Sequence, residues 1–197
     1  HTGLLREKQM PVIYSFKKRY LEKFGGPLPV FVPEASIQAI QPIEQNFHFE
    51  GFYAPTILFQ DPCAIQERSK NLADPEVFQL LSYAEPFSQT CRCDAEITIA
   101  GDGRLNAFRL ITKNILAINM QTCGTVDWHT QYIIVPLSAP ITVSKGDHVS
   151  IRFSYQGGAP LHALPDSLEV SLINQQVSVM QLASEALNYS STVQSNS

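Results

Sequence analysis

Three neighbouring residues, Asp127, Trp128 and His129, carry an acid, an indole and an imidazole side by side. An indole ring can stack on a guanidinium group, and a carboxylate next to it can accept two parallel hydrogen bonds from that group. The three residues stand just before residues 131–137, which have the composition of a β-strand. This chemistry suits the binding of an arginine side chain. A structural explanation stays open beside it, in which Trp128 fills the end of a β-barrel and Asp127 caps a turn.

The other residues that carry chemistry do not form a recognisable catalytic or metal site. The histidines His48, His148 and His162 lack the mutual spacing of metal ligands and are typical of surface or turn positions. The sequence has no Gly-x-Ser-x-Gly nucleophile motif and no local pairing of a cysteine with a histidine. We therefore expect no catalytic, cofactor-binding or metal-binding residue in this chain.

The four cysteines, Cys63, Cys91, Cys93 and Cys123, are expected to be reduced structural thiols. One residue separates Cys91 from Cys93, whereas zinc knuckles use two, and no histidine stands at ligand spacing beside them. A domain of this size does not need disulfides, because its core can stabilise it. Metal binding or redox use is the less favoured interpretation.

Length and composition favour one folded domain, or one domain with a fragment of another. The chain has 197 residues, of which 44% are hydrophobic and 16% charged, and this composition argues against wholesale disorder. A formal net charge of -4 gives no electrostatic reason to expect nucleic acid as the main partner. No stretch approaches the roughly 18 consecutive apolar residues of a membrane span, and no leader pattern opens the chain. We expect a soluble, cytoplasmic protein without a membrane partner.

The N-terminal half is predicted to contain two helices and one clear strand. Residues 4–24 have a helical pattern, interrupted or begun afresh at Pro11 and ended by Gly25 and Gly26. Residues 36–43 have the pattern of a strand, and residues 44–69 indicate loops and short strands around an aromatic cluster. A capping pattern at residues 74–76 predicts a short helix through residue 83. The first helix should carry one stripe of apolar side chains four residues apart: Val12, Phe16, Tyr20 and Phe24.

The C-terminal half is predicted to be all β. Strands are expected at residues 95–100, in two runs within 105–120, and at 131–137, 141–144, 149–155 and 167–173. Turns should fall at 101–103, 138–140, 145–147 and 157–158. The fold class is therefore mainly β, a barrel or sandwich-like antiparallel domain with an N-terminal helix and one or two short helices. Its parts are residues 1–26 as a helix, 27–174 as the barrel, and 175–197 as a polar tail with a possible short helix at 177–187.

The order of these features resembles the C-terminal β-barrel of the protein arginine N-methyltransferase family. The resemblance covers about residues 20–172: a helix, a Gly-Gly stop, the segment Pro-Leu-Pro-Val-Phe-Val-Pro at 27–33, a loop with a tryptophan, two strands and the turn Gly146-Asp147. Its most specific part is residues 128–153. The family places Thr-His-Trp, or Phe-Ser-Trp in its symmetric-dimethylating branch, where this chain has Asp127-Trp128-His129, so the tryptophan is the best match.

This resemblance implies the substrate-binding and dimerisation part of an enzyme that uses S-adenosylmethionine. The cofactor and the catalytic acids would belong to a nucleotide-binding domain that is absent from this chain, and residues 1–26 would be the end of that domain. S-adenosylmethionine is thus implied for the full-length protein, with none bound by this chain, which would not be catalytic alone. The implied partners are a protein or peptide arginine substrate, the missing catalytic domain or a partner chain, and a second copy in a homodimer. Asp127, Trp128 and His129 would contact the substrate.

Two other functions remain open on the sequence. The chain can be a stand-alone all-β module that binds a peptide or carbohydrate through exposed aromatic side chains such as Phe52, Tyr53 and Trp128. It can also be a non-catalytic subunit that meets a catalytic chain through the helix at residues 4–24. Exposure of the apolar stripe on that helix would favour a helix that packs against another domain or chain over a self-sufficient module.

Overall fold

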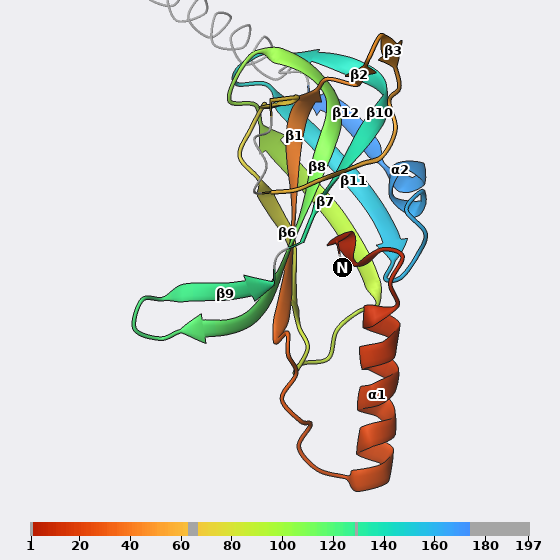
Figure 1. Ribbon diagram of the computed structural model, residues 1–197, viewed down its shortest axis with the longest axis vertical. Helices are drawn as coiled ribbons and strands as arrows, with labels where there is room; N and C mark the ends of the chain where they lie inside the picture. The colour runs from red at the N-terminus through yellow and green to blue at the C-terminus, as the bar shows by residue number, and fades with distance from the viewer. Residues whose placement is uncertain (1, 63–66, 129, 174–197) are drawn as a thin grey trace, which may run out of the picture.

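The computed structural model describes residues 2–62, 67–128 and 130–173, which form a mainly antiparallel β structure with one long helix near the N-terminus (Figure 1). Its elements are, in chain order, η1 (Thr2–Leu4), α1 (Gln9–Phe24), β1 (Ala35–Gln45), β2 (His48–Phe49), β3 (Phe52–Tyr53), β4 (Leu58–Gln60), β5 (Ser69–Asn71), β6 (Glu76–Ser82), β7 (Thr90–Thr98), β8 (Gly103–Asn119), β9 (Gly124–Trp128), β10 (Tyr132–Val143), β11 (His148–Gln156), α2 (Ala163–Ser167) and β12 (Glu169–Ile173). The predicted fold class is confirmed, as a curled half-barrel with one N-terminal helix and one short helix.

Two sheets enclose the core. In the described part of the chain, the larger sheet has the order β4-β10-β8-β1-β5, with β6 also paired to β1 and β9 to β8. The smaller sheet has the order β12-β11-β7, and β2 pairs with β3. The long strands β1 and β8 run side by side from Ala35 opposite Ile115 to Ile43 opposite Ala107. Side chains from both sheets, such as Phe108 and Ile133 from one and Ile151 from the other, meet in the main core.

Strand β11 shows why strands of the C-terminal half could be predicted from the sequence. Every second side chain from Val149 to Tyr155 is buried, and the side chains between them are exposed or half-buried. Successive residues of a strand point to opposite faces, so this alternation places one face of the smaller sheet on the core. The strand predicted at 149–155 is thus confirmed.

Helix α1 begins at Gln9, later than the predicted start at residue 4. Backbone φ angles of 66° at Gly3, 53° at Leu4 and 61° at Arg6 interrupt the helical path before it. The helix ends as predicted, because Gly25 takes the left-handed conformation with φ 55° and donates its N–H to the carbonyl oxygen of Leu21.

The short helix predicted over residues 74–83 is wrong. These residues form strand β6, which pairs with β1 from Ser82 opposite Ala35 to Glu76 opposite Ile40. The local capping signal is overridden because β6 completes the hydrogen bonding of β1 on the side away from β8.

Two predicted interruptions of the sheet are also wrong. The two runs expected within 105–120 are one strand, β8, and the turn expected at 138–140 lies inside the continuous strand β10. The register of β10 against β8 shifts between Pro136 and Ile141, so Pro140 falls where the two strands are out of register. Proline lacks the N–H of a regular ladder and is tolerated at such irregularities.

The predicted polar tail at 175–197, with the short helix expected at 177–187, lies outside the described residues, and the domain boundaries stay a prediction. Cys91 and Cys93 are free thiols buried in β7, and Cys123 is a free, exposed thiol. No helix among the described residues is long and apolar enough to cross a membrane.

Burial of the two β7 thiols predicts a loss of stability at alkaline pH. Burial raises the pKa of Cys91 to about 11, and burial together with the charges of Asp94 and Glu76 raises that of Cys93 to about 12, from an ordinary value of 9.0. Above pH 9 the unfolded chain releases thiol protons that the folded chain keeps, so the free energy of unfolding should fall as pH rises toward 11. The contribution of these two protonated thiols to the free energy of unfolding is fully present below pH 9.

Urea titrations at a series of pH values measure this loss. Cys123→Ser is the matched control, because that thiol is exposed, and it should leave the alkaline fall unchanged. A free energy of unfolding that stays flat from about pH 8 to about pH 11 would contradict the prediction.

Candidate functional site

Two of the three predicted binding residues, Asp127 and Trp128, lie on a hairpin arm that projects from the larger sheet (Figure 1). Strand β9 pairs with the end of β8, from Trp128 opposite Asn114 to Gly124 opposite Asn119. At the tip, the Asn119 side chain accepts hydrogen bonds from the N–H groups of Gln121 and Thr122, which closes the turn. The segment expected to be a loop is therefore a strand in a hairpin.

Trp128 is 53% exposed on this arm. The alternative in which Trp128 fills the end of the barrel is excluded, since a residue in that position would be buried. Other apolar side chains of the arm are exposed as well: Ile118, Met120 and Val126. The arm thus presents a large aromatic surface and several apolar side chains to its surroundings.

Asp127 and Trp128 are consecutive residues of one strand and so point to opposite faces of the hairpin. A guanidinium that stacks on the indole ring of Trp128 therefore cannot form an ion pair with the Asp127 carboxylate at the same time. His129 lies outside the described residues. The Trp128 ring thus lies on one face of the arm, and the Asp127 side chain is exposed on the reverse face.

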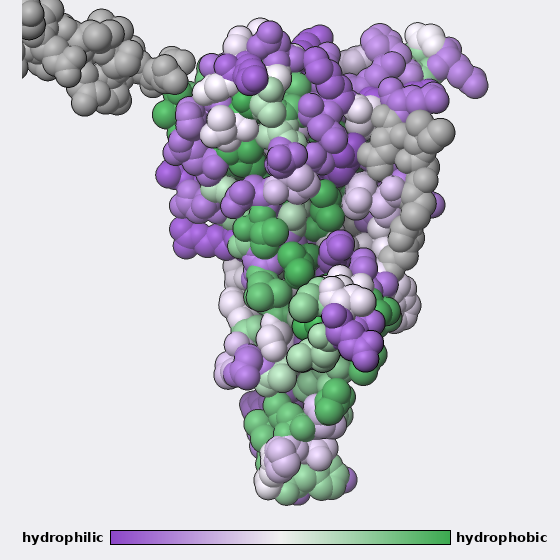
Figure 2. Space-filling view, turned by 90° about the vertical axis from the view of Figure 1, so that its left-hand side faces the viewer, coloured by the Kyte–Doolittle hydropathy of each residue, from purple (hydrophilic) through white to green (hydrophobic). Residues whose placement is uncertain are grey.

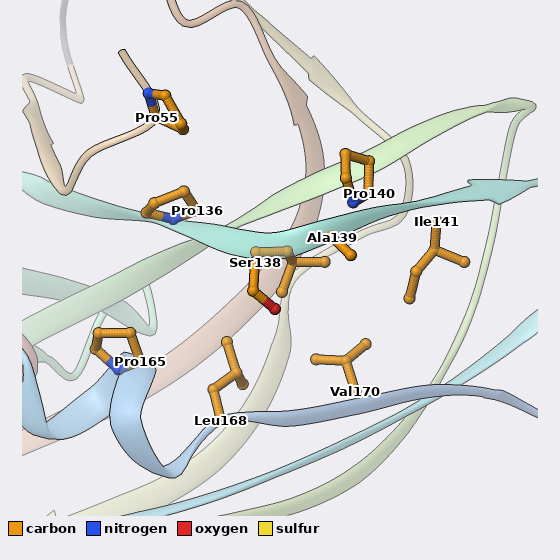
Figure 3. A pocket seen from close by; sticks show the side chains of 10 residues that line it. Pro55, Pro136, Ser138, Ala139, Pro140, Ile141, Pro165, Leu168 and Val170 are labelled. Atoms are coloured by element: carbon orange, nitrogen blue, oxygen red, sulfur yellow. The ribbon is translucent and has the colours of Figure 1, made fainter.

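A cavity of about 620 Å³ opens between the two sheets on the side where β10 faces α2 and β12. Figure 3 shows Leu168 and Val170 pointing toward β10, with Pro136 and Pro140 on the opposite side. Its walls carry no ionisable side chain: Pro55, Pro136, Leu137, Ser138, Ala139, Pro140, Ile141, Pro165, Leu168 and Val170. Such a lining can hold apolar groups, and the Ser138 hydroxyl is its one polar side-chain group among the described residues.

Arg109 is a buried cation that the sequence did not single out. It is 4% exposed, and its Nη1 donates hydrogen bonds to Gln41 Oε1 at 2.7 Å and Asn71 Oδ1 at 2.8 Å, while Nε donates to Gln60 Oε1 at 3.1 Å. Its guanidinium carbon lies 5.6 Å from the ring centre of Tyr132. Burial lowers the pKa of this guanidinium. No ion pair with a carboxylate is seen for Arg109 among the residues described, so amide oxygens and an aromatic ring hold the charge.

Arg109 thereby connects its own strand, β8, to side chains of β1, β4 and β5, and its removal should destabilise the fold. Arg109→Ala leaves the buried amide oxygen of Gln41, and the more accessible ones of Gln60 and Asn71, without their donor, and we expect it to lower the free energy of unfolding by about 2 kcal/mol. Thermal unfolding measures the change. Arg104→Ala, at an exposed position of the same strand, should stay within about 0.5 kcal/mol, and equal effects of both variants would contradict the assigned role.

Helix α1 extends away from the sheets and is covered on only part of its surface (Figure 1). Met10 is its one buried residue among those described. Lys17 holds the middle of the helix to the segment after β6, because its Nζ donates to the carbonyl oxygens of Tyr83 and Glu85 at 2.9 and 2.6 Å. The predicted apolar stripe is largely in solvent: Val12 is 62%, Phe16 44% and Phe24 62% exposed.

Apolar surface is concentrated at the end of the molecule to which α1 extends. Figure 2 shows hydrophobic residues gathered over the tapering lower end, whereas the upper part is predominantly hydrophilic. Exposed hydrophobic side chains of the described residues also include Val30 at 89% and Val32 at 71%, in the segment that follows α1. Patches of this kind mark places where another surface packs.

No group of three or more His, Cys, Asp or Glu side chains in the described residues is arranged to hold a metal ion. No family model and no curated protein matches the sequence. Among solved structures, a similar chain belongs to the Trypanosoma brucei PRMT1 enzyme-prozyme heterotetrameric complex with AdoHcy. The TM-score is 0.49 at 7% sequence identity, over 72% of this chain and 56% of that chain. The present chain thus spans little more than half the length of this neighbour.

Proposed function

We propose that this chain is the substrate-binding and partner-docking β-barrel part of an S-adenosylmethionine-dependent protein arginine methyltransferase-like protein. The observation that carries the proposal is the exposed stripe of α1. A helix that buries one residue and leaves Val12, Phe16 and Phe24 in solvent is suited to packing against another domain or chain. The order of sequence features from the Gly-Gly stop at 25–26 to the turn at 146–147 supports the family assignment.

In this proposal the catalytic domain or partner chain holds the cofactor and the acids that bind the guanidinium. S-adenosylmethionine supplies an electrophilic methyl group there. The part of the barrel is to hold the arginine substrate in position for direct transfer to its terminal nitrogen, a contribution of proximity and orientation. Trp128 offers its ring as the stacking surface, with Asp127 and His129 as further contacts to the same peptide. The chain alone has no methyl transfer of its own, and the homodimer and the cytoplasmic location remain predictions.

A stand-alone module that uses its aromatic residues as one platform is less well supported. Phe52 is 76% and Tyr53 53% exposed, so these side chains are accessible. They lie on β3, however, at the far end of the molecule from the β9 arm that carries Trp128 (Figure 1). The three aromatic side chains therefore do not form a single binding surface.

Methyl transfer by the native protein tests the proposed function. The protein isolated from its source, with whatever domain or chain accompanies it, is incubated with labelled S-adenosylmethionine and an arginine peptide. We expect label on the arginine peptide and none on the same peptide with lysine in place of arginine. The isolated 197-residue chain should transfer none. Native protein that binds arginine peptides but never labels them would overturn the proposal.

A further inference from the structure

The exposed face of α1 has a second property besides its apolar stripe. A groove of about 510 Å³ runs along it, lined by Lys8, Pro11, Val12, Ser15, Phe16, Arg19, Tyr20, Lys23 and Phe24. These positions recur every three or four residues, which is the spacing of one helix face. The whole groove therefore faces one direction along the helix.

Two parallel rows of side chains make up this groove. The apolar row is Val12, Phe16, Tyr20 and Phe24, and its rings are in contact: the centroids of Phe16 and Tyr20 lie 5.7 Å apart and those of Tyr20 and Phe24 5.0 Å apart. The second row holds Ser15, Arg19 and Lys23, with Lys8 at the N-terminal end of the groove. Rows of side chains four residues apart form ridges on a helix surface, and the side chains of a second helix pack into the grooves between such ridges.

The charge of the groove is entirely positive. Residues 8–24 carry five basic side chains and one acidic side chain, Glu22, which does not line the groove, whereas the whole chain has a net charge of -4. In the described part of the chain the ion pairs join His148 to Glu96 and Arg152 to Asp94, and none neutralises Lys8, Arg19 or Lys23. Basic side chains beside apolar surface repel a basic partner and favour one with carboxylates.

From this arrangement we propose that the groove of α1 binds an acidic amphipathic helix of the partner domain or chain. Its apolar residues pack on the row of Val12, Phe16, Tyr20 and Phe24. Two carboxylates, one helical turn apart on the partner, pair with Arg19 and Lys23, which are themselves four residues apart. This inference rests on the proposed role of α1 as an interface and adds the chemistry of the surface that covers it.

The test is a binding titration of the full chain with two synthetic helical peptides of about 20 residues. Both carry leucine along one face; one has glutamate and the other lysine in the neighbouring row. We expect the glutamate peptide to bind about tenfold more tightly at low salt, with the preference shrinking as salt is added. Phe16→Ala should weaken binding of the glutamate peptide about 30-fold.

Charge reversal gives the decisive control. The double variant Arg19→Glu/Lys23→Glu should reverse the preference toward the lysine peptide, while Lys18→Glu, a single charge reversal outside the groove, should leave it unchanged. Circular dichroism confirms that each variant keeps its fold. Equal affinity for the two peptides, or a preference that survives the double reversal, would overturn the inference.

Sedimentation of the chain without peptide tests whether a second copy of this chain, and not an acidic helix of a partner, covers the groove. A dimer that dissociates on Phe16→Ala would show that a second copy covers the groove, and the acidic-helix assignment would be wrong. These readouts do not involve methyl transfer. A native protein without methyltransferase activity would therefore refute the proposed function while leaving the peptide preference standing, and the reverse outcome is equally distinguishable.

Discussion

Met10→Ala is expected to lower the free energy of unfolding by about 3 kcal/mol, because it leaves a cavity where α1 meets the barrel. Met10 is fully buried, and its sulfur lies 3.9 Å from the Sγ of Cys91. The methionine packs directly on Gly157, where an added Cβ would come within 3.0 Å of the Met10 Cβ and closer still to its sulfur. Met10 therefore fills the space above Gly157 completely, and no room is left there for a side chain at position 157.

Urea titration measures this effect, with Met120→Ala as the matched control. Met120 is 86% exposed at the end of the arm, so its truncation should change the free energy of unfolding by less than about 0.5 kcal/mol. If the two methionine variants were equally stable, α1 would not be anchored through Met10.

If the chain is part of an arginine methyltransferase, as proposed, Trp128→Ala should weaken the binding of an arginine peptide by the native protein. Loss of the stacking surface is expected to raise KM for an arginine peptide about tenfold with kcat nearly unchanged, because an indole that stacks on the guanidinium would do so in the ground state and the transition state alike. Steady-state kinetics over a range of peptide concentrations separate the two constants.

Trp128→Phe keeps an aromatic face and should recover most of the affinity that the alanine variant loses. Asp127→Asn removes only a charge on the opposite face of the arm and should raise KM by less than Trp128→Ala does. An unchanged KM for Trp128→Ala would show that the exposed indole serves another purpose than arginine binding.

The strands of the C-terminal half were predictable because their faces differ. In β11, apolar and polar side chains alternate and one face is buried, so a period of two is visible in the sequence. The pattern misleads in β6, where Val77 is 56% and Leu80 67% exposed while Leu81 is buried, so the apolar positions follow neither a single strand face nor the helix that the capping residues suggested. Pairing with β1 decides the conformation there.

The site was predictable only in part. The apolar stripe of α1 follows from spacing alone, but spacing does not tell whether another element covers the stripe, and here none of the described elements does so fully. Arg109 gave no signal at all. Its partners come from three other strands, with Gln41 standing 68 positions earlier in the chain, and only the folded sheet brings them together.

The native mass of the protein isolated from its source tests the central claim most directly. If the exposed face of α1 packs against a catalytic domain or partner chain, the native particle should exceed the 21.9 kDa of this chain by at least a domain, on the order of 15 kDa. The additional domain or chain should also protect the backbone amides of α1 from hydrogen exchange. A native particle of 21.9 kDa with α1 open to exchange would contradict the account.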